Sequence, residues 1–190
     1  GHAGVEAEDV AIVVGALAVV AGAAQHLRQL LVLGGDQAAF GGGDLLGGEA
    51  GTPSFIVWVA KDPNSAPLDR VQIIKGWVEN GEIQEKVYDI ACSKGDVNSE
   101  THRCPDNGAR VDIRDCSITK NVGASELRTS WHDPDFDSGQ HAFYYVRGLE
   151  NPTCRWSTWD AVRAGVDPHP DLHPIIQERV WSSPIWVTPI

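Results

Sequence analysis

After about residue 51, apolar and polar side chains alternate in short runs that are separated by proline, glycine, asparagine and aspartate. Successive side chains of a strand point to opposite faces, and turn residues end each strand, so this pattern is typical of an antiparallel sandwich. Helical periodicity is nearly absent from the same region. We therefore predict a mainly β fold, an antiparallel β-sandwich-like domain with long loops.

Two of the predicted strands are joined by a strong hairpin signal, Asn80-Gly81. Pro184 favours an edge position for the last strand, because proline donates no ladder hydrogen bond. The first run is apolar enough to be buried on both faces, and the fourth and fifth are expected to pair across residues 133–137. In chain order the predicted strands are 54–60, 70–77, 83–91, 125–131, 141–149 and 182–187. Residues 158–164 predict a short helix capped by Ser157.

These strands predict one continuous core between two facing sheets. We expect it to include Phe55, Val57, Val71, Ile73, Leu127, Phe143, Tyr145 and Val146. Four tryptophans within strands are also expected in the core: Trp58, Trp77, Trp131 and Trp186. Residues 93–115 are polar and predict a long loop that a disulfide could pin.

The first 50 residues have a different composition, because 35 of them are Gly, Ala, Val, Asp or Glu, whose codons all begin with G. A GC-rich gene that is read in a wrong frame gives this bias, and we hypothesise that residues 1–43 are a translation artefact that packs poorly against the β-domain, residues 44–190. The alternative is a genuine Ala/Gly-rich helix over Ala11–Leu33 that ends at Gly34-Gly35-Asp36. The apolar run Val10–Ala24 is too short to span a bilayer.

Net charge and cysteine usage bear on the partners and the cellular compartment of the protein. The net charge of -11 offers no basic face for phosphate neutralisation, so we expect neither nucleic acid nor an anionic membrane as a partner. The four cysteines, Cys92, Cys104, Cys116 and Cys154, form no CxxC pair and favour two disulfides, with three pairings possible. This predicts export to the periplasm or the cell exterior; the alternative is four reduced thiols in the cytosol.

Four long segments carry a family resemblance. They are KDPNSAPLDRVQIIKGW, EKVYDIACS, DPDFDSGQHAFYYVRGLENPTCRWSTWDA and IQERVWSSPIWVTP. In this order they resemble the domain of unknown function 3604 family, over a match that is expected to run from about Gly42 to Ile190. Cys154 and Cys92 depart from the residues that many members have there.

The resemblance implies a function for a longer parent protein. Full-length members of the family resemble PHP-type metal-dependent hydrolases, whose N-terminal barrel carries metal motifs rich in His and Asp and is followed by a β-rich region. This chain contains no HxH segment. It is therefore expected to be a non-catalytic C-terminal β-domain, with the barrel as its partner and a divalent metal held in the parent. The alternative is a carbohydrate-binding or adhesion-type β-sandwich module, which requires exposed aromatic residues in a row on one face.

Three groups of residues are candidate sites. The charged and aromatic residues Arg155, Trp156, Glu178, Arg179 and Trp181 could face the parent's substrate, because arginine binds carboxylate or phosphate bidentately. Their alternative role is structural, with arginine paired to Glu178 or Asp160 and stacked on tryptophan.

The other two groups are candidate metal ligands. Asp133, Asp135 and Asp137 have the alternate spacing of calcium ligands, with Asp62 or Asn64 as possible helpers, but the full EF-hand pattern fails and a capped turn is the alternative. His169 and His173 are four residues apart, yet Pro168, Pro170 and Pro174 forbid a helix there and favour exposed turn residues. No Ser-His-Asp or Cys-His signature is present, so we expect no catalytic residue in this chain.

Overall fold

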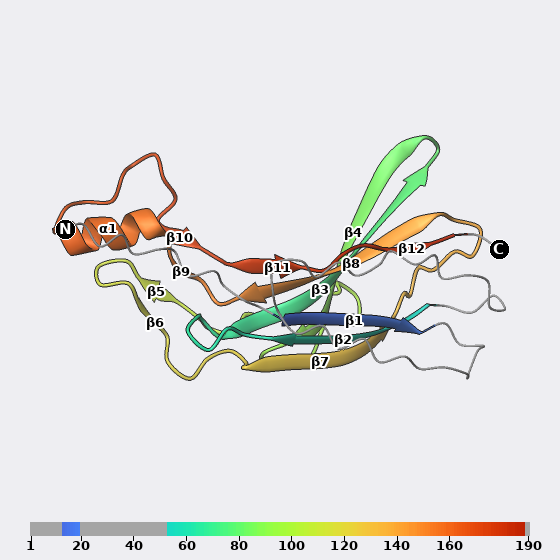
Figure 1. The fold of residues 1–190 in the computed structure, drawn as a ribbon, viewed down its shortest axis with the longest axis horizontal. Coiled ribbons are helices and arrows are strands. Elements are labelled where there is room, and N and C mark those ends of the chain that lie inside the picture. Colours follow the sequence, from blue (N-terminus) through green and yellow to red (C-terminus); the bar gives the residue numbers. More distant parts are fainter. Residues whose placement is uncertain (1–12, 20–52, 189–190) are drawn as a thin grey trace, which may run out of the picture.

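The computed structural model describes residues 13–19 and 53–188, which form two facing antiparallel sheets (Figure 1). Sheet A contains β1 (Val13–Val19), β2 (Ser54–Ala60) and β7 (Glu126–His132), in the order β1-β2-β7. Sheet B has the order β11-β8-β3-β4, and β12 also pairs with β8. Its strands are β3 (Leu68–Glu79), β4 (Glu82–Cys92), β8 (Ala142–Glu150), β11 (Arg179–Trp181) and β12 (Ile185–Val187).

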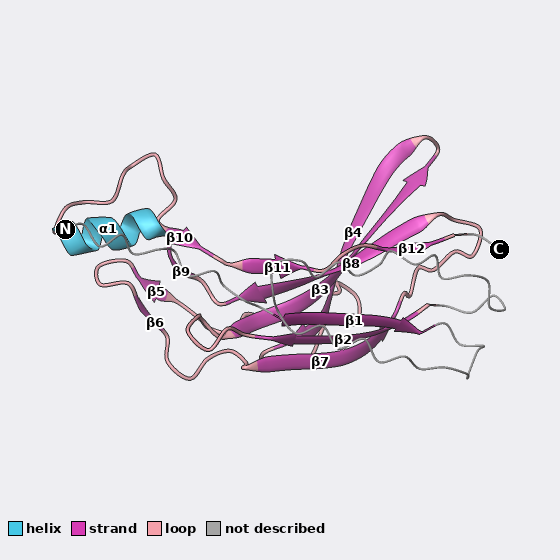
Figure 2. Ribbon diagram, in the orientation of Figure 1, coloured by secondary structure: helices cyan, strands magenta, loops and turns pink. Residues whose placement is uncertain are grey.

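Smaller elements gather at one end of the two sheets (Figure 2). They are the short hairpin of β5 (Val111–Asp112) and β6 (Ser117–Ile118), the pair β9 (Thr153–Cys154) and β10 (Ile175–Ile176), and helix α1 (Trp156–Ala164). The prediction of a mainly β, antiparallel fold is confirmed.

The β3–β4 hairpin forms where the sequence predicts it. Asn80 and Gly81 both have positive φ, 53° and 82°, which the tight two-residue turn requires. The ladder continues from Glu79↔Glu82 to Arg70↔Cys92, so both strands are longer than expected. The hairpin tip extends away from the sandwich as an arm (Figure 1).

The core lies between the sheets and confirms most of the expected residues. Phe55, Val57, Val71, Ile73 and Val146 are buried, and Leu127 packs against them. Trp77 and Trp131 also pack against this core, as predicted.

The prediction that Phe143 and Tyr145 lie in the core is wrong. Strand β8 alternates strictly, and its buried side chains are those of Ala142, Tyr144, Val146 and Glu150. Two partners fix this register. The Tyr144 hydroxyl donates to the buried carboxylate of Asp133 at 2.7 Å, which satisfies a tyrosine inside the core. On the opposite face, the Phe143 ring fills the space above Gly76, where a Cβ would come within 2.3 Å of it.

The prediction that residues 54–60 are buried on both faces is also wrong, because only one face of β2 is buried. Phe55, Val57 and Val59 face the core, whereas Ile56 and Trp58 are exposed on the other face of sheet A. Trp186 is likewise exposed rather than in the core. Alternation of buried and exposed side chains is typical of a sheet that packs against the core on one side only.

The expected pairing of residues 125–131 with 141–149 is wrong. Strand β7 pairs with β2 in sheet A, and β8 pairs with β3 in sheet B, so the loop between them crosses from one sheet to the other. Asp133, the first residue of this loop, binds Lys75 of β3 and thereby directs the chain to the second sheet.

Two predicted helices differ from the structure. Within Ala11–Leu33 the described residues Val13–Val19 are strand β1, paired along its whole length with β2, so this part of the segment has a partner. The backbone hydrogen bonds that the edge of β2 offers stabilise this strand more than helix propensity stabilises a helix. The remainder of residues 1–43 lies outside the described ranges. Helix α1 begins at Trp156, earlier than predicted, and Arg155 rather than Ser157 is its N-cap residue.

Two disulfides hold the loops, as predicted, and their pairing is Cys92–Cys104 and Cys116–Cys154. The first closes the loop after β4, which then runs beside that strand, with the Asp89 amide donating to the His102 carbonyl. The second joins the β5–β6 hairpin to β9. Two disulfides indicate an oxidising compartment outside the cytoplasm.

Removing the disulfides tests how much each stabilises the domain. The chain-entropy relation gives about 4 kcal/mol for Cys116–Cys154 and about 3 kcal/mol for Cys92–Cys104, because the first encloses the longer loop. We expect the Cys116→Ser/Cys154→Ser variant to have the lower free energy of unfolding in urea. Equal losses, or a larger loss for Cys92→Ser/Cys104→Ser, would contradict the entropic account.

Candidate functional site

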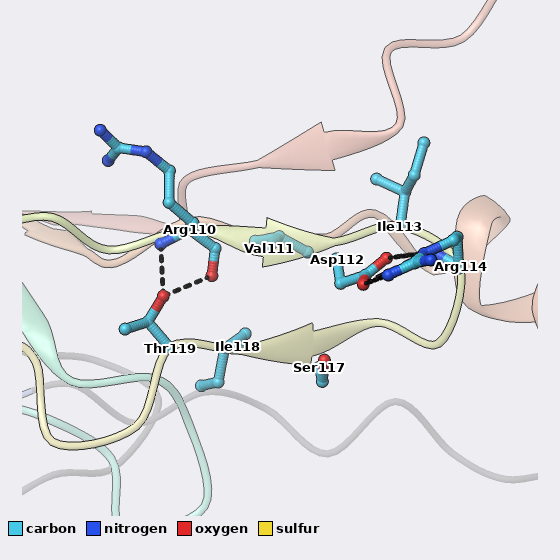
Figure 3. A pocket seen from close by; sticks show the side chains of 8 residues that line it. All are labelled: Arg110, Val111, Asp112, Ile113, Arg114, Ser117, Ile118 and Thr119. Carbon is cyan, nitrogen blue, oxygen red and sulfur yellow. Dashed lines mark hydrogen bonds and ion pairs between the residues drawn. The ribbon is translucent and has the colours of Figure 1, made fainter.

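The shallow pocket of the β5–β6 hairpin is lined by one local stretch of chain (Figure 3). Its charged groups are already engaged: Arg114 binds Asp112, and Arg110 binds Asp106. The hydrogen bonds from Arg114 lower the pKa of Asp112 to about 2. The charged side chains of the lining are therefore all held in ion pairs, which leaves no unpaired charged group among the described residues that line this pocket. Its residues are Arg110, Val111, Asp112, Ile113, Arg114, Ser117, Ile118 and Thr119.

Two of the three calcium candidates, Asp133 and Asp135, bind the ammonium group of Lys75. The Lys75 ammonium lies 2.6 Å from the Asp133 carboxylate and 2.7 Å from the Asp135 carbonyl, and both partners of the ion pair are buried. The Asp135 carboxylate binds Lys86, and Asp137 caps the amide of Gly139. The Lys75 ammonium thus supplies to the oxygens of Asp133 and Asp135 the positive charge that a calcium ion would bring.

Two tyrosines complete this cluster. Burial, together with a hydrogen bond to Asp135, raises the pKa of Tyr88, and burial with a hydrogen bond to Asp133 raises the pKa of Tyr144. Hydrogen bonds from Lys86 and Tyr88 lower the pKa of Asp135. Both tyrosines therefore stay neutral and donate hydrogen bonds to the two aspartates, which suits a structural network.

The histidine pair lies on an exposed loop after α1. His169 accepts from the Asp171 amide, and His173 contacts the backbone of Ile175. In the part of the chain that the structure describes, no three His, Cys, Asp or Glu side chains are placed to hold a metal ion. The residues described also include no helix that is long and apolar enough to cross a membrane.

The five substrate-facing candidates separate into two groups. Arg155 and Trp156 lie at the start of α1, where Arg155 donates to the His173 carbonyl and Trp156 is exposed. Arg179 and Trp181 lie on β11, and Glu178 immediately precedes them. Among the described residues, neither Arg155 nor Arg179 has a carboxylate within ion-pair distance, and Asp160 pairs with Arg163 instead. The predicted Arg–Glu178 or Arg–Asp160 pairs are therefore not formed.

The side of sheet B that faces away from the core, here called the outer face, brings together residues from several strands. Trp181 of β11 lies directly opposite Arg147 of β8, which lies opposite Gln72 of β3 and then Asp89 of β4. These four residues form one cross-strand row.

Hydrogen bonds connect this row. The buried Asp89 accepts from Gln72 at 2.6 Å, and the Gln72 carbonyl oxygen accepts from Nε of Arg147 at 2.8 Å. Gln72 is neutral, so the charge of Arg147 is not compensated by any carboxylate in the described part of the chain. Arg70 is different, because it pairs with both Asp69 and Asp89.

The other end of the outer face is aromatic and apolar. Trp186 packs on Phe143 with ring centroids 5.2 Å apart, and Phe143 stacks along the strand with Tyr145. Val78 and Ile83 face each other across the hairpin arm and continue this surface beyond Gly76. We call Val78, Ile83, Phe143 and Trp186 the apolar end, and Arg147, Arg179 and Trp181 the arginine end.

Sequence reasoning missed Arg147 although the signal was present. In the segment AFYYVRGLE the arginine has the same parity as Phe143 and Tyr145, so a polar residue marks the odd positions as the outward face. Gln72 carries no such signal, because only the ladder register places it beside Arg147.

Glu150 is a buried acid at the end of β8. Its side chain is fully buried, Ser65 donates to Oε2, and Oε1 has no hydrogen-bond partner among the residues described. Burial raises the pKa of Glu150 against the opposing effects of Ser65 and Lys61.

Comparison with known proteins finds one family. The sequence profile described as "Protein of unknown function (DUF3604)" matches residues 21–189. The match begins well before Gly42, where the resemblance was expected to start. No curated protein and no solved structure matches the chain.

Lys75→Met tests the buried ion pair. It leaves the Asp133 carboxylate buried without a counter-charge, so we expect a loss of about 3–5 kcal/mol in the free energy of unfolding. Lys86→Met is the matched control, because its pair with Asp135 is at the surface, where such pairs contribute about 0–1 kcal/mol. Urea denaturation measures both; similar losses would mean that the buried pair is not structural.

Glu150→Gln tests the buried acid through the pH dependence of stability. A raised pKa in the folded protein stabilises fully below the ordinary glutamate pKa, and this contribution is lost as pH rises through the folded pKa. We therefore expect the free energy of unfolding of Glu150→Gln, relative to wild type, to increase across that window and then level off. Glu82→Gln, at the exposed hairpin tip, should give no such trend; the same trend for both variants would refute the assignment to Glu150.

Proposed function

This chain belongs to the DUF3604 family, and from that premise we propose that it is a non-catalytic accessory β-domain of a metal-dependent hydrolase. The hydrolase activity rests on the resemblance of full-length members to PHP-type enzymes. In this proposal a divalent metal is held by an N-terminal barrel of the parent, and this domain packs against that barrel. The two disulfides support export of the parent to the periplasm or the cell exterior.

The observation that carries the proposal is the apolar end of the outer face. Ile83 is 85% exposed, Val78 60% and Trp186 51%. Large apolar side chains that lie together on a surface mark an interaction site, because burying them against a partner removes apolar area from water. The extended arm of β3 and β4 could reach a neighbouring domain (Figure 1).

A second candidate, the carbohydrate-binding module, is favoured by one observation. Trp181 and Trp186 are both exposed, and their ladder partners Arg147 and Phe143 lie on the same face of β8. The side chain of Tyr145 lies between these two partners along the strand. Two exposed tryptophans on one sheet face support this second candidate, which needs exposed aromatic residues in a row.

The accessory role is tested with the barrel domain of a full-length relative, produced separately and mixed with this chain. We expect the two to associate in sedimentation-velocity experiments, and Ile83→Lys to weaken association by about tenfold or more, because it places a charge in an apolar contact. Val166→Lys, exposed after α1, is the matched control. We also expect only the barrel to hydrolyse p-nitrophenyl phosphate with added Mn²⁺ or Zn²⁺.

Two outcomes would overturn the accessory role. One is metal-dependent hydrolysis by this chain alone. The other is an association that Ile83→Lys and Val166→Lys leave equally strong, since the apolar end would then not be the contact.

A further inference from the structure

We propose that the arginine end of the outer face binds the acidic groups of an anionic sugar chain, with Trp181 under a sugar ring. This inference deepens the second candidate function and rests on it. It names the class of ligand, a saccharide with carboxylate or sulfate groups, and the residues that select it.

The first step of the argument is the charge balance of the face. Arg70 is neutralised between Asp69 and Asp89, at 2.8 Å and 3.3 Å. Arg147 and Arg179, by contrast, have no carboxylate partner among the described residues. Two uncompensated guanidinium groups on a protein of net charge -11 form a local positive site that attracts anions.

The second step is preorganisation. Nε of Arg147 is held by Gln72, which is held by the buried Asp89, and Asp89 also accepts from the Cys104 amide at 2.7 Å. The Cys92–Cys104 disulfide fixes the loop that supplies this amide. The Arg147 guanidinium is therefore oriented before a ligand arrives, while its Nη groups are not engaged by any described residue. A planar, oriented guanidinium binds carboxylate or sulfate through paired hydrogen bonds.

The third step is the aromatic platform. Trp181 is 54% exposed and is the ladder partner of Arg147, and Arg179 lies two residues before it on the same face of β11. By strand geometry, the Cα atoms of Trp181 and Arg147 lie about 5 Å apart, and those of Trp181 and Arg179 about 7 Å apart. An exposed indole offers a flat apolar surface to the C–H face of a pyranose ring. Guanidinium groups on two sides of it match a sugar that carries acidic substituents.

The test is titration of this chain with defined oligosaccharides, followed by tryptophan fluorescence and calorimetry. The carboxylated probe is tetragalacturonate, the sulfated probe is a chondroitin sulfate tetrasaccharide, and the neutral probe is maltotetraose. We expect at least one anionic probe to bind, to weaken as NaCl is added, and to bind better than maltotetraose. The stronger of the two anionic probes identifies the acidic group.

Variants assign the binding to residues. Arg179→Gln and Arg147→Gln should each weaken the anionic probe by about ten- to hundredfold, because a charged hydrogen-bonding partner is lost. Trp181→Ala should weaken it as well. Arg163→Gln and Trp58→Ala, exposed elsewhere on the domain, should leave the affinity unchanged. Arg179 is exposed and donates a hydrogen bond to the Gln177 carbonyl, so its variant stays informative if Arg147→Gln fails to fold.

Three other outcomes would overturn all or part of the proposal. Binding of maltotetraose that depends on Trp181 but not on the arginines would overturn the anionic inference and keep the carbohydrate-binding role. No binding of any sugar at millimolar concentration would overturn both. Equal affinity for a glutamate decapeptide would show that charge alone is recognised and would overturn the assignment to a sugar.

Discussion

The buried ion pair between Lys75 and Asp133 is the constraint on which the arrangement of the two sheets depends. Asp133 directly follows β7 of sheet A, and Lys75 lies in the middle of β3 of sheet B. A lysine and an aspartate out of water are tolerable only together, so the end of β7 must lie against β3. The same carboxylate accepts from Tyr144, which directs the tyrosine into the core and sets which residues of β8 face outward.

The outer face of sheet B follows from that register. Because Tyr144 and Val146 are buried, Phe143, Tyr145 and Arg147 project from the opposite side. Gly76 makes room for Phe143, and Gln72 holds Arg147. The alternation of β8 thus places Phe143 in the apolar end and Arg147 in the arginine end of one surface, where the neighbouring strands add the other residues. The proposed contact with a catalytic barrel and the proposed sugar site use these two ends separately.

The loops around the sandwich are ordered by covalent and polar links more than by apolar packing. The Cys92–Cys104 disulfide holds the long loop beside β4, and through the Cys104 amide it also supports Asp89 and the cross-strand row. Cys116–Cys154 attaches the β5–β6 hairpin to β9, the strand that follows β8 in the chain. Such links suit an oxidising compartment and keep loop residues in place where little core is available.

The sequence by itself determined the elements that depend on local physics. A continuous apolar run located β2, and alternating runs located β3, β4, β7 and β8. Asn80-Gly81 placed the hairpin, and the even cysteine count predicted two disulfides. Long motifs in order identified the family. Trp181 and Arg179 were candidates from their residue types alone.

Only the tertiary structure decided what depends on partners far apart in the chain. It paired the cysteines, separated β7 and β8 into different sheets, and placed the Lys75 ammonium against Asp133 and Asp135, two of the three calcium candidates. It also turned Val13–Val19 into a strand, because the edge of β2 supplies hydrogen bonds that no local propensity records. Arg147 and Trp181 are 34 positions apart in sequence, 181 minus 147, and meet only through the ladder of β8 and β11. Register across strands depends on the whole sandwich, and so the sequence alone could not bring these two residues together.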